Sequence, residues 1–171
     1  MGRDKALLPY RGTTLAQSVA AAVRAVTETV RVVGSPLHHA YLGYPVVVDV
    51  YPGEGPLGGI LTALQQTSAD WNLIVACDMP GLEADFLRRL LDTAEHSSGD
   101  ALVPAGPSGR LEPLCAAYHR RSLQGLYTAF ARGVRKIAAA LEEVRTITWH
   151  VPEVSCFQNV NTPEDWAAYE R

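Results

Sequence analysis

Two aspartates stand directly after apolar runs that are typical of buried strands. Asp78 follows the run 73–77 (LIVAC), and Asp49 follows the run 46–48 (VVV). Ligands in open α/β sheets bind beyond the carboxyl ends of the strands, so both carboxylates are predicted to reach a binding site. A carboxylate there suits Mg²⁺, which takes one or two such ligands and leaves its other positions to water and substrate phosphates. The structural alternative for Asp78 is that it only caps the turn that follows.

Two glycine-containing segments could contact phosphate groups or a nucleotide ring. Near the start, Gly2, Arg3 and Lys5 could form half of a loop whose N–H groups and lysine hold phosphate. The segment 53–59 (GEGPLGG), which includes Gly58, precedes a helical pattern, and its glycines would let a ring or sugar approach the backbone. The alternatives are a solvated lysine and a tight turn with close helix packing.

Two asparagines near the end of the sequence add neutral ligands. Asn159 and Asn161 point to the same face if this segment is extended, so their amides could bind phosphate, a ring edge or a metal together. The residues that follow, 162–165 (TPED), are explained by helix capping, with Thr162 at the N-cap and Pro163 at the first helical position.

Several other kinds of site are not supported. The five histidines show no metal-ligand spacing, and no GxSxG segment supports a serine hydrolase. The three cysteines lie far apart without CxxC spacing, which argues against a zinc site and a disulfide framework. We interpret all three, Cys77, Cys115 and Cys156, as small buried hydrophobes.

Composition favours one soluble globular domain over residues 1–171. The chain is 47% hydrophobic and 19% charged, with a formal net charge of -3. No lysine and arginine cluster indicates a nucleic-acid partner. No apolar run reaches the roughly 20 residues of a membrane helix, and the first ten residues lack the apolar core of a secretory signal. A cytoplasmic location is therefore expected.

Strand and helix patterns alternate along the chain, which predicts an α/β fold with a mostly parallel sheet and helices on both faces. Strands are expected at 30–34, 46–49, 72–77, 101–104 and 146–151, and helices at 14–26, 60–66, 83–96, 122–131, 134–143 and 162–170. The turn-rich segment 105–110 joins the strand at 101–104 to segment 111–118 as a hairpin excursion.

No strand pattern precedes residues 1–5. In a doubly wound sheet the first strand is usually central, and without it two neighbouring strands would keep unpaired edges and exposed apolar faces. We therefore expect that the first strand and its phosphate loop, about 20 residues, are missing from these 171 residues and that the natural protein is longer.

Taken in order, these segments resemble the molybdenum cofactor guanylyltransferases of the nucleotidyltransferase superfamily. The likeness spans essentially the whole chain and is carried by 1–15 (MGRDKALLPYRGTTL), 46–49 (VVVD), 55–60 (GPLGGI), 76–80 (ACDMP), 110–118 (RLEPLCAAY) and 157–166 (FQNVNTPEDW). Relatives that make other dinucleotide cofactors or nucleotide sugars share single pieces, whereas NVNTPED points to the guanylyl branch. The resemblance implies a Rossmann-like three-layer αβα fold whose first strand is absent here.

The resemblance also implies roles for the nucleotide-side residues. Lys5 matches the family lysine that contacts nucleotide phosphates, and Asp49 matches the nucleotide-binding aspartate after the second strand. Asp78 matches the Mg²⁺ aspartate, so Lys5 and Asp78 are the expected catalytic residues. Gly2 and Gly58 belong to the matching glycine segments and are assigned to the nucleotide.

On the pterin side, Asn159 and Asn161 match the NVN of the family, and Asn161 is also expected near the metal. Arg110 is a further candidate for the pterin site. Two departures stand out. An asparagine that some members use for the nucleotide is Gly34 or Ser35 here, and the family's opening strand and LAGGxSxRMG-like loop are represented only by the final Met-Gly.

The activity implied is transfer of GMP from GTP to molybdopterin, with Mg²⁺ as cofactor and pyrophosphate as the other product. One alternative is a cytidylyltransferase for the same pterin or another nucleotidyltransferase, because base choice depends largely on the missing loop. Another is a non-catalytic module that binds nucleotide or pterin. Oligomeric state stays open, as do transient contacts with the proteins that mature molybdoenzymes.

Overall fold

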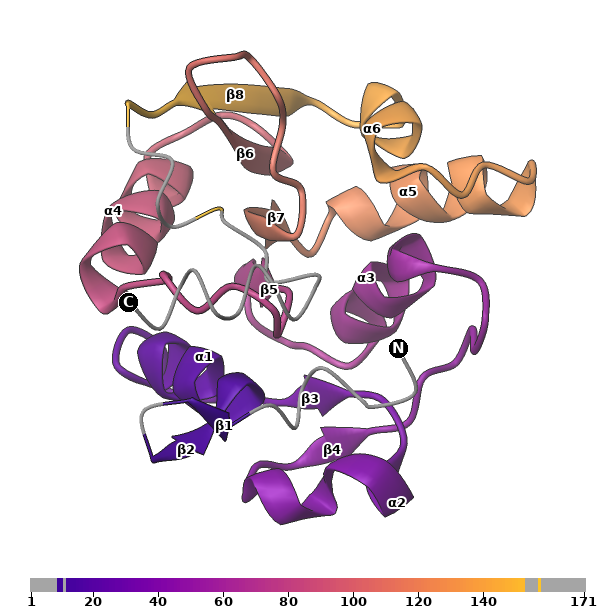
Figure 1. Ribbon diagram of the computed structural model, residues 1–171. Helices are drawn as coiled ribbons and strands as arrows, with labels where there is room; N and C mark the ends of the chain where they lie inside the picture. Colours follow the sequence, from indigo (N-terminus) through magenta and orange to yellow (C-terminus); the bar gives the residue numbers. More distant parts are fainter. Residues whose placement is uncertain (1–8, 11, 153–156, 158–171) are drawn as a thin grey trace.

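Helices lie on both faces of the strands in the computed structural model, which describes residues 9–10, 12–152 and 157 (Figure 1). The α/β, three-layer fold expected from the sequence is confirmed. The strands are β1 (Pro9–Tyr10), β2 (Thr13–Thr14), β3 (Val32–Val33), β4 (Val46–Val47), β5 (Trp71–Val75), β6 (Ala101–Ala105), β7 (Cys115–His119) and β8 (Thr146–His150). The α-helices are α1 (Leu15–Arg24), α2 (Pro36–His39), α3 (Pro56–Gln65), α4 (Ala84–Glu95), α5 (Ser122–Ala131) and α6 (Ile137–Ala140), with 3-10 turns η2 (Ala40–Leu42) and η3 (Leu141–Glu143).

The strands form one larger sheet and two smaller pairs. The larger sheet has the order β5-β7-β6-β8, in which β6 and β8 are parallel and β7 runs antiparallel to both of its neighbours. Strands β3 and β4 form a separate parallel pair, and β1 and β2 form a short hairpin. The antiparallel return of β7 after the turn at 106–110 is the hairpin excursion that the sequence predicted.

Two apolar cores cover the two faces of the larger sheet. Side chains alternate along β6 and β7, because successive residues of a strand point to opposite faces. Val103 and Tyr118 pack with α3, α5 and α6, whereas Leu102 and Ala117 pack with α1 and α4. The sheet is therefore covered by helices on both sides, as the alternation of elements predicted.

Local signals explain where several helices begin and end. At the start of α1, the Thr14 hydroxyl accepts a hydrogen bond from the Gln17 N–H at 3.2 Å, and the Gln17 side chain accepts one from the Thr14 N–H at 3.1 Å. This capping box fixes the helix start that the sequence predicted at Thr14. Helix α5 has the predicted bounds, and α3 begins earlier than predicted, at Pro56.

The predicted helix at 134–143 is shorter than expected. Gly133 has a φ of 90°, and α6 begins only at Ile137. The Arg135 side chain donates hydrogen bonds to the Phe130 carbonyl, in the last turn of α5, and to the Val134 carbonyl, three residues beyond the helix. Residues 134–136 therefore cap α5 instead of continuing a helix. The hairpin of β1 and β2 and helix α2 had no sequence signal, because their elements are too short to show a period.

Of the three cysteines, Cys115 is buried as expected, but Cys77 is exposed. The prediction is wrong for Cys77 because it lies in the turn beyond β5, where the chain has left the sheet. Cys156 and the predicted helix at 162–170 lie outside the described residues. Among the helices in the described ranges, none is long and apolar enough to cross a membrane.

Candidate functional site

Asp78 lies three residues beyond the end of β5, in a turn that contacts of Met79 and Pro80 hold in place. Met79 is 2% exposed and anchors the turn in the core between α1 and α4. The Tyr10 hydroxyl donates a hydrogen bond to the Pro80 carbonyl at 3.1 Å. Asp78 itself is half-buried, and its carboxylate makes no hydrogen bond or ion pair with any described residue. Its environment therefore leaves both carboxylate oxygens available to a ligand.

Asp49 is half-buried just beyond β4 and holds the turn that leads to α3. Its Oδ1 accepts hydrogen bonds from the Tyr51 N–H at 3.0 Å and from the Thr62 hydroxyl at 2.9 Å. Thr62 is fully buried, and its oxygen also accepts from the Val50 N–H at 3.1 Å. At least one oxygen of Asp49 is thus engaged in the fold, a role that the sequence did not indicate.

The glycine-rich segment 53–59 forms this turn and the first residues of α3. Gly53 and Gly55 both have a φ of 80°, a conformation that side chains disfavour. Gly55 is the N-cap and Pro56 the first helical residue, and no described side chain caps the helix. Pro56 has no N–H, the Gly58 N–H donates to the Gly55 carbonyl at 3.0 Å, and Leu57 is fully buried. The start of α3 therefore offers an anion the positive end of the helix dipole rather than a row of free N–H groups.

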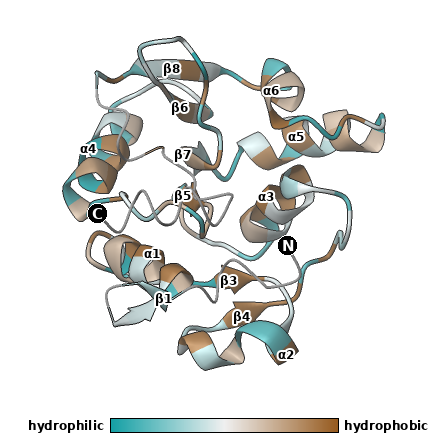
Figure 2. Ribbon diagram, in the orientation of Figure 1, coloured by the Kyte–Doolittle hydropathy of each residue, from teal (hydrophilic) through white to brown (hydrophobic). Residues whose placement is uncertain are grey.

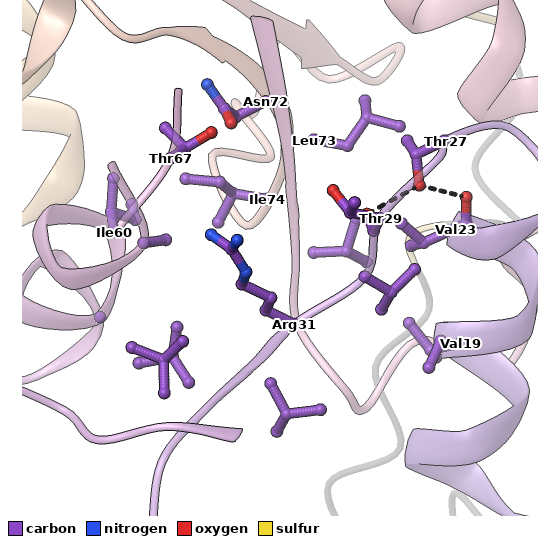
Figure 3. A pocket seen from close by; sticks show the side chains of 18 of the residues that line it. Val19, Val23, Thr27, Thr29, Arg31, Ile60, Thr67, Asn72, Leu73 and Ile74 are labelled. Atoms are coloured by element: carbon purple, nitrogen blue, oxygen red, sulfur yellow. Dashed lines mark hydrogen bonds between the residues drawn. The ribbon is translucent and has the colours of Figure 1, made fainter. Parts of the chain in front are cut away.

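Asp78 and the start of α3 line one cavity, part of which is shown in Figure 3. The cavity has a volume of about 1140 Å³, and Pro56 and Gly59 contribute to its wall together with Asp78. The strand-end carboxylate and the start of α3 therefore contribute to the wall of the same cavity. Asp49 and Gly58 do not line this cavity. Asp49 accepts a hydrogen bond from the Tyr51 N–H in the turn, and Gly58 packs directly against Tyr51.

Arg110 lies apart from this cavity in the exposed turn at 106–110. Its Nε is 3.5 Å from Oε1 of Glu112, whose side chain is only 13% exposed. Burial raises the pKa of the Glu112 carboxyl, and the charge of Arg110 offsets part of that rise. Arg110 therefore compensates a half-buried carboxylate, and its assignment to the pterin stays a prediction.

Arg135 ties the end of α5 to the glycine-rich segment. Its Nε is 2.6 Å from Oε2 of Glu54, and its guanidinium lies 4.0 Å from the centre of the Phe130 ring. The Nη1 group also donates to the Phe130 carbonyl at 2.8 Å. A pair separated by 81 residues has no local sequence signal, and this contact was missed.

The remaining predicted site residues fall outside the part of the chain that the structure describes. They are Gly2, Arg3 and Lys5 near the start and Asn159 and Asn161 near the end. Their roles stay predictions.

A single carboxylate in this setting suits Mg²⁺ better than a fully protein-bound metal. Within the described ranges, no three histidine, cysteine, aspartate or glutamate side chains gather as a metal site. Mg²⁺ needs only one or two carboxylates when substrate phosphates supply further ligands. The half-buried carboxylate of Asp78, which has no hydrogen-bond or ion-pair partner among the described residues, fits that type of site.

Comparison with known proteins decides the family. A family model described as the MobA-like NTP transferase domain matches residues 1–145. The chain belongs to this nucleotidyltransferase family. Among curated MobA-like relatives, the molybdenum cofactor guanylyltransferase of Vibrio cholerae is 33% identical, and the match covers 98% of this chain and 83% of the relative. A probable molybdenum cofactor guanylyltransferase of Bacillus cereus is 29% identical, with 99% of this chain and 89% of the relative covered.

Solved structures agree with the MobA-like assignment. The molybdopterin-guanine dinucleotide biosynthesis protein A of Archaeoglobus fulgidus has a TM-score of 0.84 and 26% identity, with 99% of this chain and 90% of that chain covered. The 2-C-methyl-D-erythritol 4-phosphate cytidylyltransferase of Thermus thermophilus has a TM-score of 0.75 at 20% identity, which shows the shared fold alone.

Proposed function

We propose that this MobA-like protein transfers GMP from GTP to molybdopterin and releases pyrophosphate. The observation that carries the proposal is the placement of Asp78. Its carboxylate lies beyond β5 without a partner among the described residues, in the same cavity wall as the uncapped start of α3. The names of the Vibrio cholerae and Archaeoglobus fulgidus relatives support guanine as the base and the pterin as the acceptor.

The chemistry is an in-line displacement at phosphorus. A terminal phosphate oxygen of molybdopterin forms a bond to the α-phosphorus of GTP, and the bond between that phosphorus and the bridging oxygen of pyrophosphate breaks. A phosphate monoester already carries about 1.5 to 2 negative charges near pH 7, so the nucleophile needs no general base. The protein therefore has to align the two substrates and compensate the negative charge that gathers around the α-phosphate.

The chain's own residues divide these tasks. Asp78 would hold Mg²⁺, which when bound supplies positive charge next to the phosphates. The start of α3 offers the partial positive charge of its helix dipole to the nucleotide from the same wall of the cavity. We assign Asp49 and Gly58 to the nucleotide as well, and both also fix the turn that leads into α3.

Residues outside the described ranges complete the proposal. We assign Gly2 and Lys5 to the nucleotide phosphates and Asn159 and Asn161 to the pterin, with Asn161 also near the metal. GTP and molybdopterin are the proposed substrates, Mg²⁺ the proposed metal and the cytoplasm the proposed location. Proteins that mature molybdoenzymes are the proposed recipients of the product.

Pyrophosphate release from GTP and molybdopterin tests the proposal. Asp78→Asn should lower kcat/KM by about 100-fold or more, the scale seen when one group that stabilises transition-state charge is lost. Asp85→Asn is the matched control, because Asp85 lies on α4 outside the cavity wall and forms an exposed ion pair with Arg88. Equal activity of the two variants would contradict the proposal, and so would turnover of CTP in preference to GTP.

A further inference from the structure

The direction of the Asp78 carboxylate depends on the backbone on either side of it, because no described residue bonds its side chain. On the sheet side, the Ala76 N–H donates to the Leu114 carbonyl at 2.8 Å, which ties the chain after β5 to the residue before β7. The next two residues leave the sheet, and the chain is buried again at Met79 and Pro80. Residues 77 and 78 thus lie between two anchored points.

The Met79 side chain is the apolar part of the second anchor. It is 2% exposed and belongs to the core that α1 and α4 share on one face of the larger sheet. Figure 2 shows hydrophobic and hydrophilic residues alternating along α4, the pattern of a helix with one face against such a core. Apolar packing is not directional, and a methionine side chain adapts to the space around it. Met79 therefore holds the turn against the core but leaves its orientation to another contact.

That contact is a hydrogen bond from Tyr10. Its hydroxyl donates to the carbonyl of Pro80, two residues after Asp78, at 3.1 Å, and both bonded residues are buried. A hydrogen bond is directional, because it weakens steeply as its angle departs from linear. The proline ring already fixes φ at residue 80, so a fixed carbonyl leaves this residue little backbone freedom. The bond therefore sets the orientation of the turn that carries the carboxylate.

Tyr10 is itself held by the unit formed by the β1–β2 hairpin and α1. Tyr10 pairs with Thr13 across the hairpin, and Thr14 at the end of β2 is the N-cap of α1. Val19 of α1 then packs in the same core as Met79. Hairpin and helix thus meet the turn after β5 together, the hairpin through a hydrogen bond and the helix through the apolar core.

We propose that Tyr10 is a positioning residue for the metal ligand, because its hydrogen bond to Pro80 holds the Asp78 carboxylate in the direction that binds the metal. The proposal rests on the proposed function, in which Asp78 is that ligand. Groups that orient a metal ligand without touching the metal typically contribute about 10- to 100-fold in metal affinity or activity. Tyr10→Phe keeps the ring and removes only the donor to the buried carbonyl.

Tyr118 offers a matched control on the other face of the larger sheet. Its ring is buried, and its hydroxyl also donates to a proline carbonyl, that of Pro113, at 2.8 Å. Tyr10→Phe and Tyr118→Phe therefore remove the same kind of hydrogen bond and should shift the midpoint of urea denaturation by similar amounts. Binding of Mn²⁺ in place of Mg²⁺, measured with GTP by electron paramagnetic resonance, separates the two. Tyr10→Phe should weaken Mn²⁺ binding about tenfold, and Tyr118→Phe should leave it unchanged.

A double-mutant cycle tests whether the effect of Tyr10 acts through Asp78. Asp78→Asn alone should weaken Mn²⁺ binding at least about tenfold. In the Asp78→Asn background, Tyr10→Phe should weaken binding no further, because the ligand that it orients is already lost. A second readout needs no metal. The Leu82 N–H donates to the Met79 carbonyl within this turn at 3.2 Å, so Tyr10→Phe should speed exchange of the Leu82 amide at least about tenfold and leave the Ala76 amide unchanged.

The outcomes separate this proposal from the proposed function. The role of Tyr10 is overturned, and the metal site stands, if Asp78→Asn weakens Mn²⁺ binding but Tyr10→Phe does not. It is also overturned if Tyr118→Phe weakens binding as much, if Tyr10→Phe acts equally with and without the Asp78 carboxylate, or if the Leu82 amide is unaffected. Wild-type Mn²⁺ affinity in Asp78→Asn would overturn both proposals together.

Discussion

The packing of Gly58 against Tyr51 makes a sharp prediction, because the next residue offers a matched control. A Cβ added to Gly58 would lie 2.9 Å from the Tyr51 Cβ and 3.1 Å from the Tyr51 carbonyl oxygen. A Cβ added to Gly59 would meet no atom within 4 Å. The same substitution to alanine at two neighbouring positions of α3 therefore probes the contact and little else.

Tyr51 cannot move away without disturbing the site. Its N–H donates to Asp49 at 3.0 Å, its hydroxyl accepts from the Gln65 side chain at 2.9 Å, and its ring packs on Phe130 at 4.9 Å. Overpacking of this kind typically costs about 1 to 3 kcal/mol. Alanine regains up to about 1 kcal/mol over glycine in a helix. Gly58→Ala should thus lower the free energy of unfolding by up to about 2 kcal/mol, while Gly59→Ala should raise it by up to about 1 kcal/mol.

Urea denaturation followed by circular dichroism measures both values. Because Gly58→Ala displaces Tyr51 and so the Asp49 contact, it should also raise KM for GTP under the proposed function. Equal stability of the two alanine variants would refute the argument that Gly58 is required for the close approach of α3 to the turn.

Three further predictions concern other contacts. Thr62→Val removes two hydrogen bonds with little change of shape and should cost about 2 to 4 kcal/mol in urea denaturation, whereas the exposed Thr128→Val should cost under about 0.5 kcal/mol. Arg135→Gln should change the free energy of unfolding by about 1 kcal/mol or less, because the ion pair of Arg135 with Glu54 is half-exposed. The variant should still raise KM for GTP, because segment 53–59 loses this contact. An unchanged KM would rule out this role of Arg135. Burial, followed by the charge of Arg121, lowers the pKa of His119 below its ordinary 6.5, so the folded protein binds this proton less well than the unfolded chain. Stability should therefore fall as the pH drops below about 6.5, and His119→Gln should reduce that slope in pH-dependent melting curves.

The sequence predicted those helices and strands whose bounds are set by residues close to them in the chain. The capping box of Thr14 and Gln17 set the start of α1, and the apolar run before Asp78 marked β5. The helix expected from Val134 was wrong in its first residues because Arg135 bonds to the end of α5 and to Glu54. A contact between residues 81 positions apart cannot be detected in a stretch of sequence as short as one helix.

The site was predictable to a similar extent. The position of Asp78 beyond an apolar strand followed from the sequence, and so did the turn formed by segment 53–59, although β5 is half-buried rather than buried. The engagement of Asp49 by Thr62 could not be seen, because it depends on how α3 packs against the end of β4. The place of β5 at the edge of the larger sheet, among the described strands, likewise emerges only from the order of the strands.

Metal binding tests the central claim most directly. Mn²⁺ can stand in for Mg²⁺, and its electron paramagnetic resonance signal reports binding to the protein in the presence of GTP. The wild-type protein and Asp85→Asn should bind Mn²⁺ with GTP equally well, whereas Asp78→Asn should bind it at least about tenfold more weakly. Unchanged Mn²⁺ affinity in Asp78→Asn would contradict the assignment of this carboxylate to the metal.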